Sequence, residues 1–289
     1  MAVHKRNYAA YSGPTTPRWS RFLILTRYSV RSIFQSKIIT VLFLLSYAFP
    51  LFLVAALYFN HNAYLLSLLR MNQLNHGRLM TIDGKFFMGL MGFQASAAFL
   101  LTTFVGPGLV SPDLVNNALP LYFSRQLSRT EYVLGRGSVI FLILSAITWI
   151  PGVILFFIET NLEGWSWGWD HIQYLNGILV GSLLWIAILA LLSLSLSAWV
   201  RWKVVAGGLL LGVMFATSAF AAAIHGVLNS NAGFYLDPAA LIAVIFANLF
   251  DIPKNSDIPT LNACVAMLAM CAFCVWLLSR KIRAFQVVR

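Results

Sequence analysis

The residues best suited to specific chemistry lie in one polar stretch, 111–136, between two long apolar runs. It opens with Ser111, Pro112 and Asp113: a serine that can cap a helix, a proline suited to the first helical position, and an acid favoured in the first turn. We therefore expect a short helix from Ser111 to about Leu119, where the following proline ends it.

A second helix start lies at the end of the same stretch. Ser128 and Glu131 are spaced as a capping box directly before an apolar run. Between the two helix starts, Asn116, Asn117 and Arg125 supply polar groups that a protein partner could contact. The local pattern predicts a structured loop with a polar outer face.

Catalytic and metal-binding patterns are missing from the sequence. There is no phosphate-binding Gly-x-x-x-x-Gly-Lys-[Ser/Thr], no His-Glu-x-x-His and no Gly-x-Ser-x-Gly. Four histidines are scattered along the chain, namely His4, His61, His76 and His171. His225, near the outer end of the fifth apolar run, is the candidate for a proton-coupling role, and the weaker alternative of a membrane-embedded enzyme or an ion-coupled carrier would depend on it. We expect no catalytic residue, no metal and no cofactor in this chain.

The composition places the chain in lipid. It has 289 residues, of which 60% are hydrophobic and 10% charged, whereas a soluble domain is about a quarter charged. Cys264, Cys271 and Cys274 all lie in one apolar run and fit small apolar membrane residues better than a disulfide framework. We expect an all-α integral membrane protein.

Six apolar runs are long enough to cross a bilayer, which takes about 20 residues. They lie at about Ile38–Phe59, Phe86–Val110, Val133–Ile158, Leu175–Trp199, Val204–Leu228 and Leu261–Ser279. Pro151 falls inside the third run and is tolerable if neighbouring helices satisfy the freed backbone groups. A seventh run, Pro238–Phe250, suits a re-entrant or interfacial helix.

Basic residues set the orientation. Sixteen of the 20 Lys and Arg residues fall in the segments before the first run, after the second and fourth runs, and in the tail, and seven of the nine acids fall in the other loops. The positive-inside rule then predicts six spans with both termini in the cytoplasm. This distribution also explains the net charge of +11 without nucleic acid.

We expect residues 1–17 to form a cytoplasmic tail and residues 18–37 to form an amphipathic interfacial helix. The six-span domain then follows at 38–289. Arg21, Arg27 and Arg31 lie opposite an apolar face. That face comprises Trp19, Phe22, Leu23, Val30, Ile33 and Phe34. A basic amphipathic helix beside a span lies in the headgroup layer, where it either anchors the first span or moves with it as a lever.

Two outer segments carry further features. Trp165, Trp167 and Trp169 fit an interfacial aromatic belt or, alternatively, a docking surface for a lipid or an external partner. Residues 237–253 form an outer helical element that could line an exit for an amphiphile or fill a crevice as a lid.

Small residues recur at helix-packing spacing within the runs. The pairs are Gly177 with Gly181, Gly208 with Gly212, and Ser193 with Ser197. Each pair shares one helix face, which allows close approach of a second helix.

The loop resembles the cytoplasmic loop of ABC-2 type transporter permeases, the membrane subunits of ATP-binding-cassette exporters. The matching residues are Asp113, Leu119, Leu121, Ser124, Arg125, Ser128, Arg129, Tyr132, Leu134 and Gly135. The departures are Asn117-Ala118 where glycine-threonine is usual, Gln126 for proline and Arg136 for lysine. The expected six spans and outer helical element also resemble that family.

The resemblance implies a multi-pass subunit of the bacterial plasma membrane that pairs with a second permease copy, as a homodimer or a heterodimer. A separate cytoplasmic ATPase dimer would hold the ATP and Mg²⁺ and act through a coupling loop at 111–132. The coupling residues would be Ser111, Pro112, Asp113, Asn116, Asn117, Leu119, Arg125, Ser128 and Arg129. Membrane lipids and an outer accessory protein are further partners compatible with this reading. The sequence favours an amphiphilic, lipid-like cargo without naming one, and the alternative is a scaffold or anchor with no pathway of its own.

Overall fold

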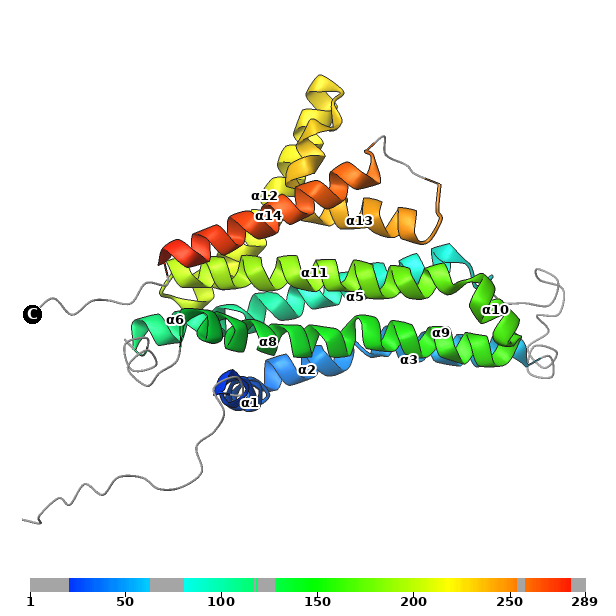
Figure 1. Ribbon diagram of the computed structural model, residues 1–289, viewed down its shortest axis with the longest axis horizontal. Helices are drawn as coiled ribbons and strands as arrows, with labels where there is room; N and C mark the ends of the chain where they lie inside the picture. The colour runs from blue at the N-terminus through cyan, green and yellow to red at the C-terminus, as the bar shows by residue number, and fades with distance from the viewer. Residues whose placement is uncertain (1–20, 63–80, 117, 119–127, 254–257, 282–289) are drawn as a thin grey trace, which may run out of the picture.

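The computed structural model describes residues 21–62, 81–116, 118, 128–253 and 258–281. Within these ranges all regular elements are helices. Six helical stretches are long and apolar enough to cross a membrane. Figure 1 shows most of them running side by side along the long axis of the molecule. The predicted all-α chain with six candidate spans is thus confirmed.

Three of the six stretches are single helices and three consist of two helices in line. The two-part stretches are α2 (Lys37–Leu45) with α3 (Ala48–His61), α5 (Gly84–Val105) with α6 (Pro107–Val115), and α8 (Arg129–Ile147) with α9 (Trp149–Glu163). The single helices are α11 (Ile172–Trp199), α12 (Lys203–Leu228) and α14 (Thr260–Lys281). Shorter elements are α1 (Arg21–Ile33), α10 (Trp165–Asp170), the 3₁₀ helix η3 (Asn231–Leu236) and α13 (Pro238–Leu249).

Prolines account for the breaks in the two-part stretches. A proline lacks the N–H that would bond to the carbonyl four residues earlier, and its ring collides with that carbonyl. Pro50 lies four residues after Ser46, where α2 ends, and Pro151 lies three residues after Thr148, between α8 and α9. Pro107 begins α6 directly after the break at Gly106.

Two of these breaks are joined to each other. The hydroxyl of Tyr47, between α2 and α3, donates a hydrogen bond of 2.7 Å to the carbonyl of Ala146, beside the break at Thr148. A side chain of the first span therefore reaches the backbone of the third span next to Ile147, whose carbonyl loses its helix partner to Pro151.

The core lies around α11, which packs against α5, α6, α8, α13 and α14. Ile178, Ile186 and Leu189 of α11 are fully buried. By contrast, the first span, α12 and α14 are mostly exposed along their apolar lengths. Figure 1 shows α12 running at a steep angle to α11 and α8. The apolar faces left open suit lipid or a second protein chain.

The short helix α13 packs closely on α11 because two positions of α11 are glycines. Asp237 caps α13 by accepting from the N–H of Ala239 at 3.0 Å, and Pro238 is its first residue, where the predicted seventh apolar run begins. A Cβ at Gly181 would lie 2.1 Å from the Phe246 ring, and one at Gly177 would lie 2.9 Å from the ring of Phe250. Phe246 and Phe250 are nearly fully buried, which favours a helix that fills a crevice over one exposed at the interface.

The two predicted glycine pairs therefore differ. Gly177 and Gly181 allow close helix contact, whereas a Cβ at Gly208 or Gly212 of α12 would meet nothing within 4 Å. The face of α12 that carries these two glycines has no neighbour among the described residues.

The amphipathic N-terminal segment differs from the prediction. The helix α1 ends at Ile33, and α2 begins at Lys37. Leu23 and Phe34, which the sequence places on the apolar, membrane-facing side, are 46% and 36% exposed. The face turned to α8 instead contains Thr26 and Ser29, both buried, flanked by Leu25, Val30 and Ile33. Trp19 lies outside the described residues, while Arg27 and Arg31 are exposed as predicted.

Adding one methyl group at Gly181 tests the packing of α13 against α11. Gly181→Ala should destabilise the protein by about 1–3 kcal/mol, because the new Cβ overlaps the buried Phe246 ring. Thermal unfolding in detergent would measure the loss. Gly212→Ala is the matched control, since its Cβ meets open space and alanine favours a helix by about 1 kcal/mol. Equal unfolding midpoints for the two variants would contradict the packing described.

Candidate functional site

The predicted helix start at Ser111 is wrong. Ser111 lies inside α6, which begins at Pro107, and Pro112 also lies within that helix. Ser111 is fully buried: its hydroxyl donates to the carbonyl of Val200 at 2.8 Å, and its N–H donates to the hydroxyl of Ser197 at 3.0 Å. The hydroxyl that could have capped a new helix instead fastens α6 to the end of α11.

The serine pair of α11 lies along this contact. Ser197 donates to the carbonyl of Pro107 at 3.3 Å, and a Cβ at Gly106 would lie 2.6 Å from the Cβ of Ser193. The small residues at 193 and 197 thus allow α6 to approach α11 closely, as their spacing predicts.

Asp113 forms the centre of a second, charged contact. Its carboxylate accepts a 2.7 Å hydrogen bond from the hydroxyl of Tyr132 and pairs with the guanidinium of Arg136, both on α8. Asp113 and Arg136 are 9% and 8% exposed, and Tyr132 is fully buried. A charge-assisted pair at this depth ties α6 to α8.

Arg136 also reaches α1. Its second terminal nitrogen donates to the hydroxyl of Ser29 at 2.7 Å. One turn away, Thr26 donates to the carbonyl of Gly135 at 3.1 Å and lies 2.8 Å from the hydroxyl of Ser138. The guanidinium therefore joins three helices, and we call Ser29, Asp113, Tyr132 and Arg136 the Asp113 cluster.

Three further predicted residues, Asn116, Ser128 and Arg129, lie at the ends of α6 and α8. Asn116 is exposed just after α6. Ser128 caps α8: it accepts from the N–H of Glu131 at 3.2 Å, and Glu131 accepts from the N–H of Ser128 at 2.6 Å, which confirms the capping box. Arg129 is exposed in the first turn of α8. Asn117, Leu119 and Arg125 lie outside the described residues.

Sequence reasoning missed Thr26 and Ser29, and it noted Arg136 only as a departure from lysine. A signal for Ser29 was available, since two small polar residues three positions apart interrupt an otherwise apolar helix face. Nothing in the sequence indicated which span that face would meet.

An apolar pocket of about 450 Å³ opens in the other half of the bundle, between α5, α12 and α13. Its lining includes Phe99, Trp185, Met214, Phe215 and Phe246, with Ser96 and Ser218 as the hydroxyl side chains. Trp185 directs its N–H to the carbonyl of Ala95 at 2.9 Å, which leaves its ring to line the cavity. The pocket suits a hydrocarbon chain better than a polar molecule.

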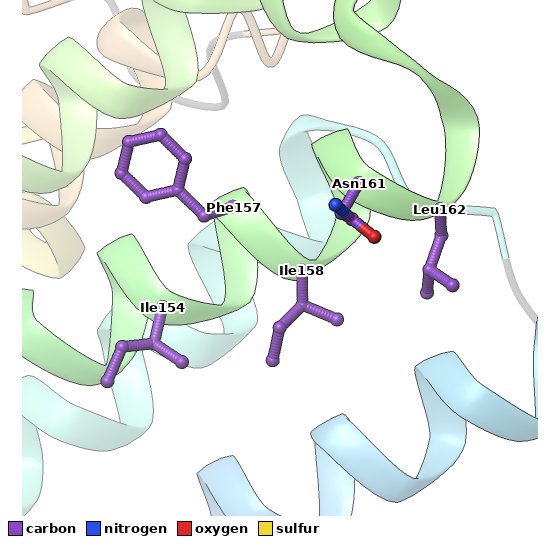
Figure 2. Close-up of a pocket in the computed structure, with 5 residues that line it drawn as sticks. All are labelled: Ile154, Phe157, Ile158, Asn161 and Leu162. Carbon is purple, nitrogen blue, oxygen red and sulfur yellow. The ribbon is translucent and has the colours of Figure 1, made fainter.

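A second pocket, of about 380 Å³, lies on α9 alone (Figure 2). Ile154, Ile158 and Leu162 point to the same side, with the amide of Asn161 beside them. With all five lining residues on one helix, it is a shallow groove in which Asn161 is the one polar side chain.

The other residues singled out in the sequence are placed as follows. Trp165 and Trp169 on α10 are 68% and 72% exposed, whereas Trp167 packs inward against Phe156 and stacks on His171 with ring centroids 4.6 Å apart. His225 is exposed near the end of α12 and contacts the ring of Phe234. The three cysteines are free thiols on α14.

Comparison with known proteins gives no family. No model of a protein family matches the chain, and no curated protein matches it.

The Asp113 cluster yields a stability prediction. Asp113→Asn removes the anion and leaves the guanidinium of Arg136 buried without a counter-charge, which should cost about 3–5 kcal/mol. Chemical denaturation in mild detergent would measure it. The control is Asp170→Asn, at an exposed acid of α10, with an expected change under about 0.5 kcal/mol.

Replacing both charges separates the contribution of the ion pair from the cost of leaving one buried charge unpaired. Asp113→Leu with Arg136→Met removes both ions together, so the double variant should be more stable than Asp113→Asn. A double variant that is weaker than the single one would show that the ion pair itself is not what Asp113 contributes.

Proposed function

We propose that the chain is the membrane subunit of an ATP-driven exporter for an amphiphilic or lipid-like substrate, powered by a separate ATPase chain. In this proposal the end of the bundle with α1 and α6 faces the cytoplasm, in line with the basic residues there. The observation that carries the proposal is the Asp113 cluster, because it fastens the segment expected to meet an ATPase to α1 and α8.

A coupling contact has to transmit a displacement without yielding. The helix α6 is bonded on one side to α11 through Ser111 and on the other to α8 through Asp113. A displacement of the residues after Val115 would therefore move the bases of two spans together, and α1 with them. Ser111 and Asp113 act in this proposal as positioning residues rather than as contact residues, because both are buried.

The contact surface itself would consist of exposed polar residues. Asn116, Ser128 and Arg129 are exposed at the two ends of the loop that joins α6 to α8. They offer amide, hydroxyl and guanidinium groups to a partner that carries acceptors and negative charge. Since charged groups at the edge of a contact govern mainly the rate of association and its salt dependence, Arg129 is the residue to test first.

The pocket between α5, α12 and α13 supports the choice of cargo. Its aromatic and aliphatic lining offers no charged group to a polar substrate among the described residues. One wall is α12, whose apolar side is largely open, so a lipid chain could enter sideways from the bilayer. A second permease copy facing α12 would close a pathway between the two halves.

Charge reversal tests the coupling surface. Arg129→Glu should weaken association with the ATPase at least about tenfold, because an attractive contact becomes a repulsive one. The measurement is co-purification of the ATPase with tagged chain, followed by ATP hydrolysis in nanodiscs. Lys85→Glu, at an exposed lysine at the opposite end of the bundle, is the control and should leave both unchanged.

A scaffold without a pathway would give another result. If a stable complex formed but moved no lipid in proteoliposomes under ATP turnover, the anchor reading would replace the exporter. If no ATPase bound to the wild-type chain, both the coupling surface and the exporter would be rejected.

Filling the apolar pocket tests the cargo. Ala243→Trp should reduce ATP-driven movement of a fluorescent phospholipid about tenfold, because the indole occupies the cavity that α5, α12 and α13 enclose. Binding of the ATPase should persist. The matched control is Ala269→Trp, at an exposed alanine of α14 outside the pocket. Equal transport by the two variants would exclude this cavity from the pathway.

A further inference from the structure

A histidine and two glutamates meet where the first and third spans end, at the α10 end of the bundle. His61 is the last residue of α3, and Glu159 and Glu163 lie one turn apart at the end of α9. The Nε2 atom of His61 lies 3.0 Å from a carboxylate oxygen of Glu163 and 3.7 Å from one of Glu159. One ligand atom from each residue lies within 4.8 Å of the other two.

Both carboxylates at this point are shielded from water, one of them almost completely. Glu159 is 1% exposed, and Glu163 and His61 expose 23% and 16% of their side chains. Both α3 and α9 end here, and the C-terminus of a helix carries a partial negative charge that disfavours carboxylates. A cation between the two helix ends would offset both carboxylates and both helix dipoles.

The hydrogen bond of the other ring nitrogen of His61 determines what Nε2 presents to the two carboxylates. Its Nδ1 lies 3.0 Å from the carbonyl of Leu57, which can only accept, so Nδ1 carries a hydrogen. If the ring is neutral, Nε2 then directs a lone pair at two carboxylates, which repel it. This is the arrangement of a ligand atom that shares a cation with both carboxylates.

The spacing suits a small tetrahedral metal ion. Bonds of about 2.0–2.2 Å place tetrahedral ligand atoms about 3.3–3.6 Å apart, and the two separations from Nε2, 3.0 and 3.7 Å, lie on either side of that range. A histidine whose other nitrogen donates to a backbone carbonyl is the usual arrangement around zinc. Imidazole nitrogen and carboxylate oxygen are both zinc ligands, and three protein ligands leave a fourth position open.

We propose that His61, Glu159 and Glu163 bind one divalent transition-metal ion of the Zn²⁺ type. The imidazole selects it over Mg²⁺ and Ca²⁺, which prefer all-oxygen sites. The ion joins the ends of α3 and α9 and so holds the first span, which is largely exposed along its length, against the third. This site is independent of the proposed transport function and lies at the opposite end of the bundle from the Asp113 cluster.

The experiment uses the full chain, purified in detergent and stripped with a chelator. Zn²⁺ alone is titrated against it near neutral pH in the presence of excess Mg²⁺, bound metal is counted by mass spectrometry after dialysis, and Co²⁺ is used as a spectroscopic substitute. We expect one Zn²⁺ per chain, the absorption bands of tetrahedral cobalt, and a higher unfolding temperature with Zn²⁺. His61→Ala and Glu163→Gln should each weaken binding at least about tenfold to a hundredfold.

A conservative ligand variant and a control variant make the result specific. Glu163→Gln keeps the size of a partly exposed side chain, so it tests ligation even if His61→Ala disturbs folding, and size-exclusion chromatography verifies that each variant is folded. His225→Ala removes an exposed histidine outside the cluster and should leave Zn²⁺ binding unchanged.

Three results would overturn the site. One is the absence of Zn²⁺ retention by the wild-type chain. Another is an equal loss of binding in His225→Ala, which would mark adventitious metal. The third is stabilisation of the protein by acid with no effect of Zn²⁺, which would show that Nε2 carries a proton in place of a metal ion.

Discussion

Arg136 is a permanent cation at a buried position, and the arrangement of three helices follows from the need to compensate it. A guanidinium does not lose its proton inside a protein, so burial has to be offset by a counter-charge and hydrogen-bond acceptors. Asp113 supplies the charge from α6, and Ser29 supplies an acceptor from α1. With both partners in place, α1 and α6 have one docking position on α8, which explains why these two short helices are held against the same span.

Features that depend on neighbours in sequence could be predicted without the structure. The six apolar stretches, the capping box at Ser128 and the Asp237-Pro238 start of α13 follow from hydropathy, side-chain length and proline geometry within a few residues. The same local rules failed at Ser111. A serine before a proline and an acid reads as a helix cap, but α6 is already helical from Pro107, and the hydroxyl bonds to Val200 instead.

The candidate site was predicted less well because its partners are distant in sequence. Ser29 and Arg136 are 107 positions apart, and His61 and Glu163 are 102 apart. Periodicity assigns a residue to a helix face, but it does not say which helix that face meets. The two glycine pairs make the same point: their spacing is identical, yet one pair seats α13 while the other meets no described residue. Where a close contact forms is decided by the partner surface, which a single helix does not encode.

The proline breaks have a mechanical consequence. Where the backbone hydrogen bonds of a helix are already interrupted, one part of the helix can bend against the other without losing further hydrogen bonds. Three spans have such joints, at Ser46, Gly106 and Thr148. Two of these joints, at Ser46 and Thr148, are tied to each other by the bond from Tyr47 to Ala146, so bending of the first span at its joint is coupled to bending of the third.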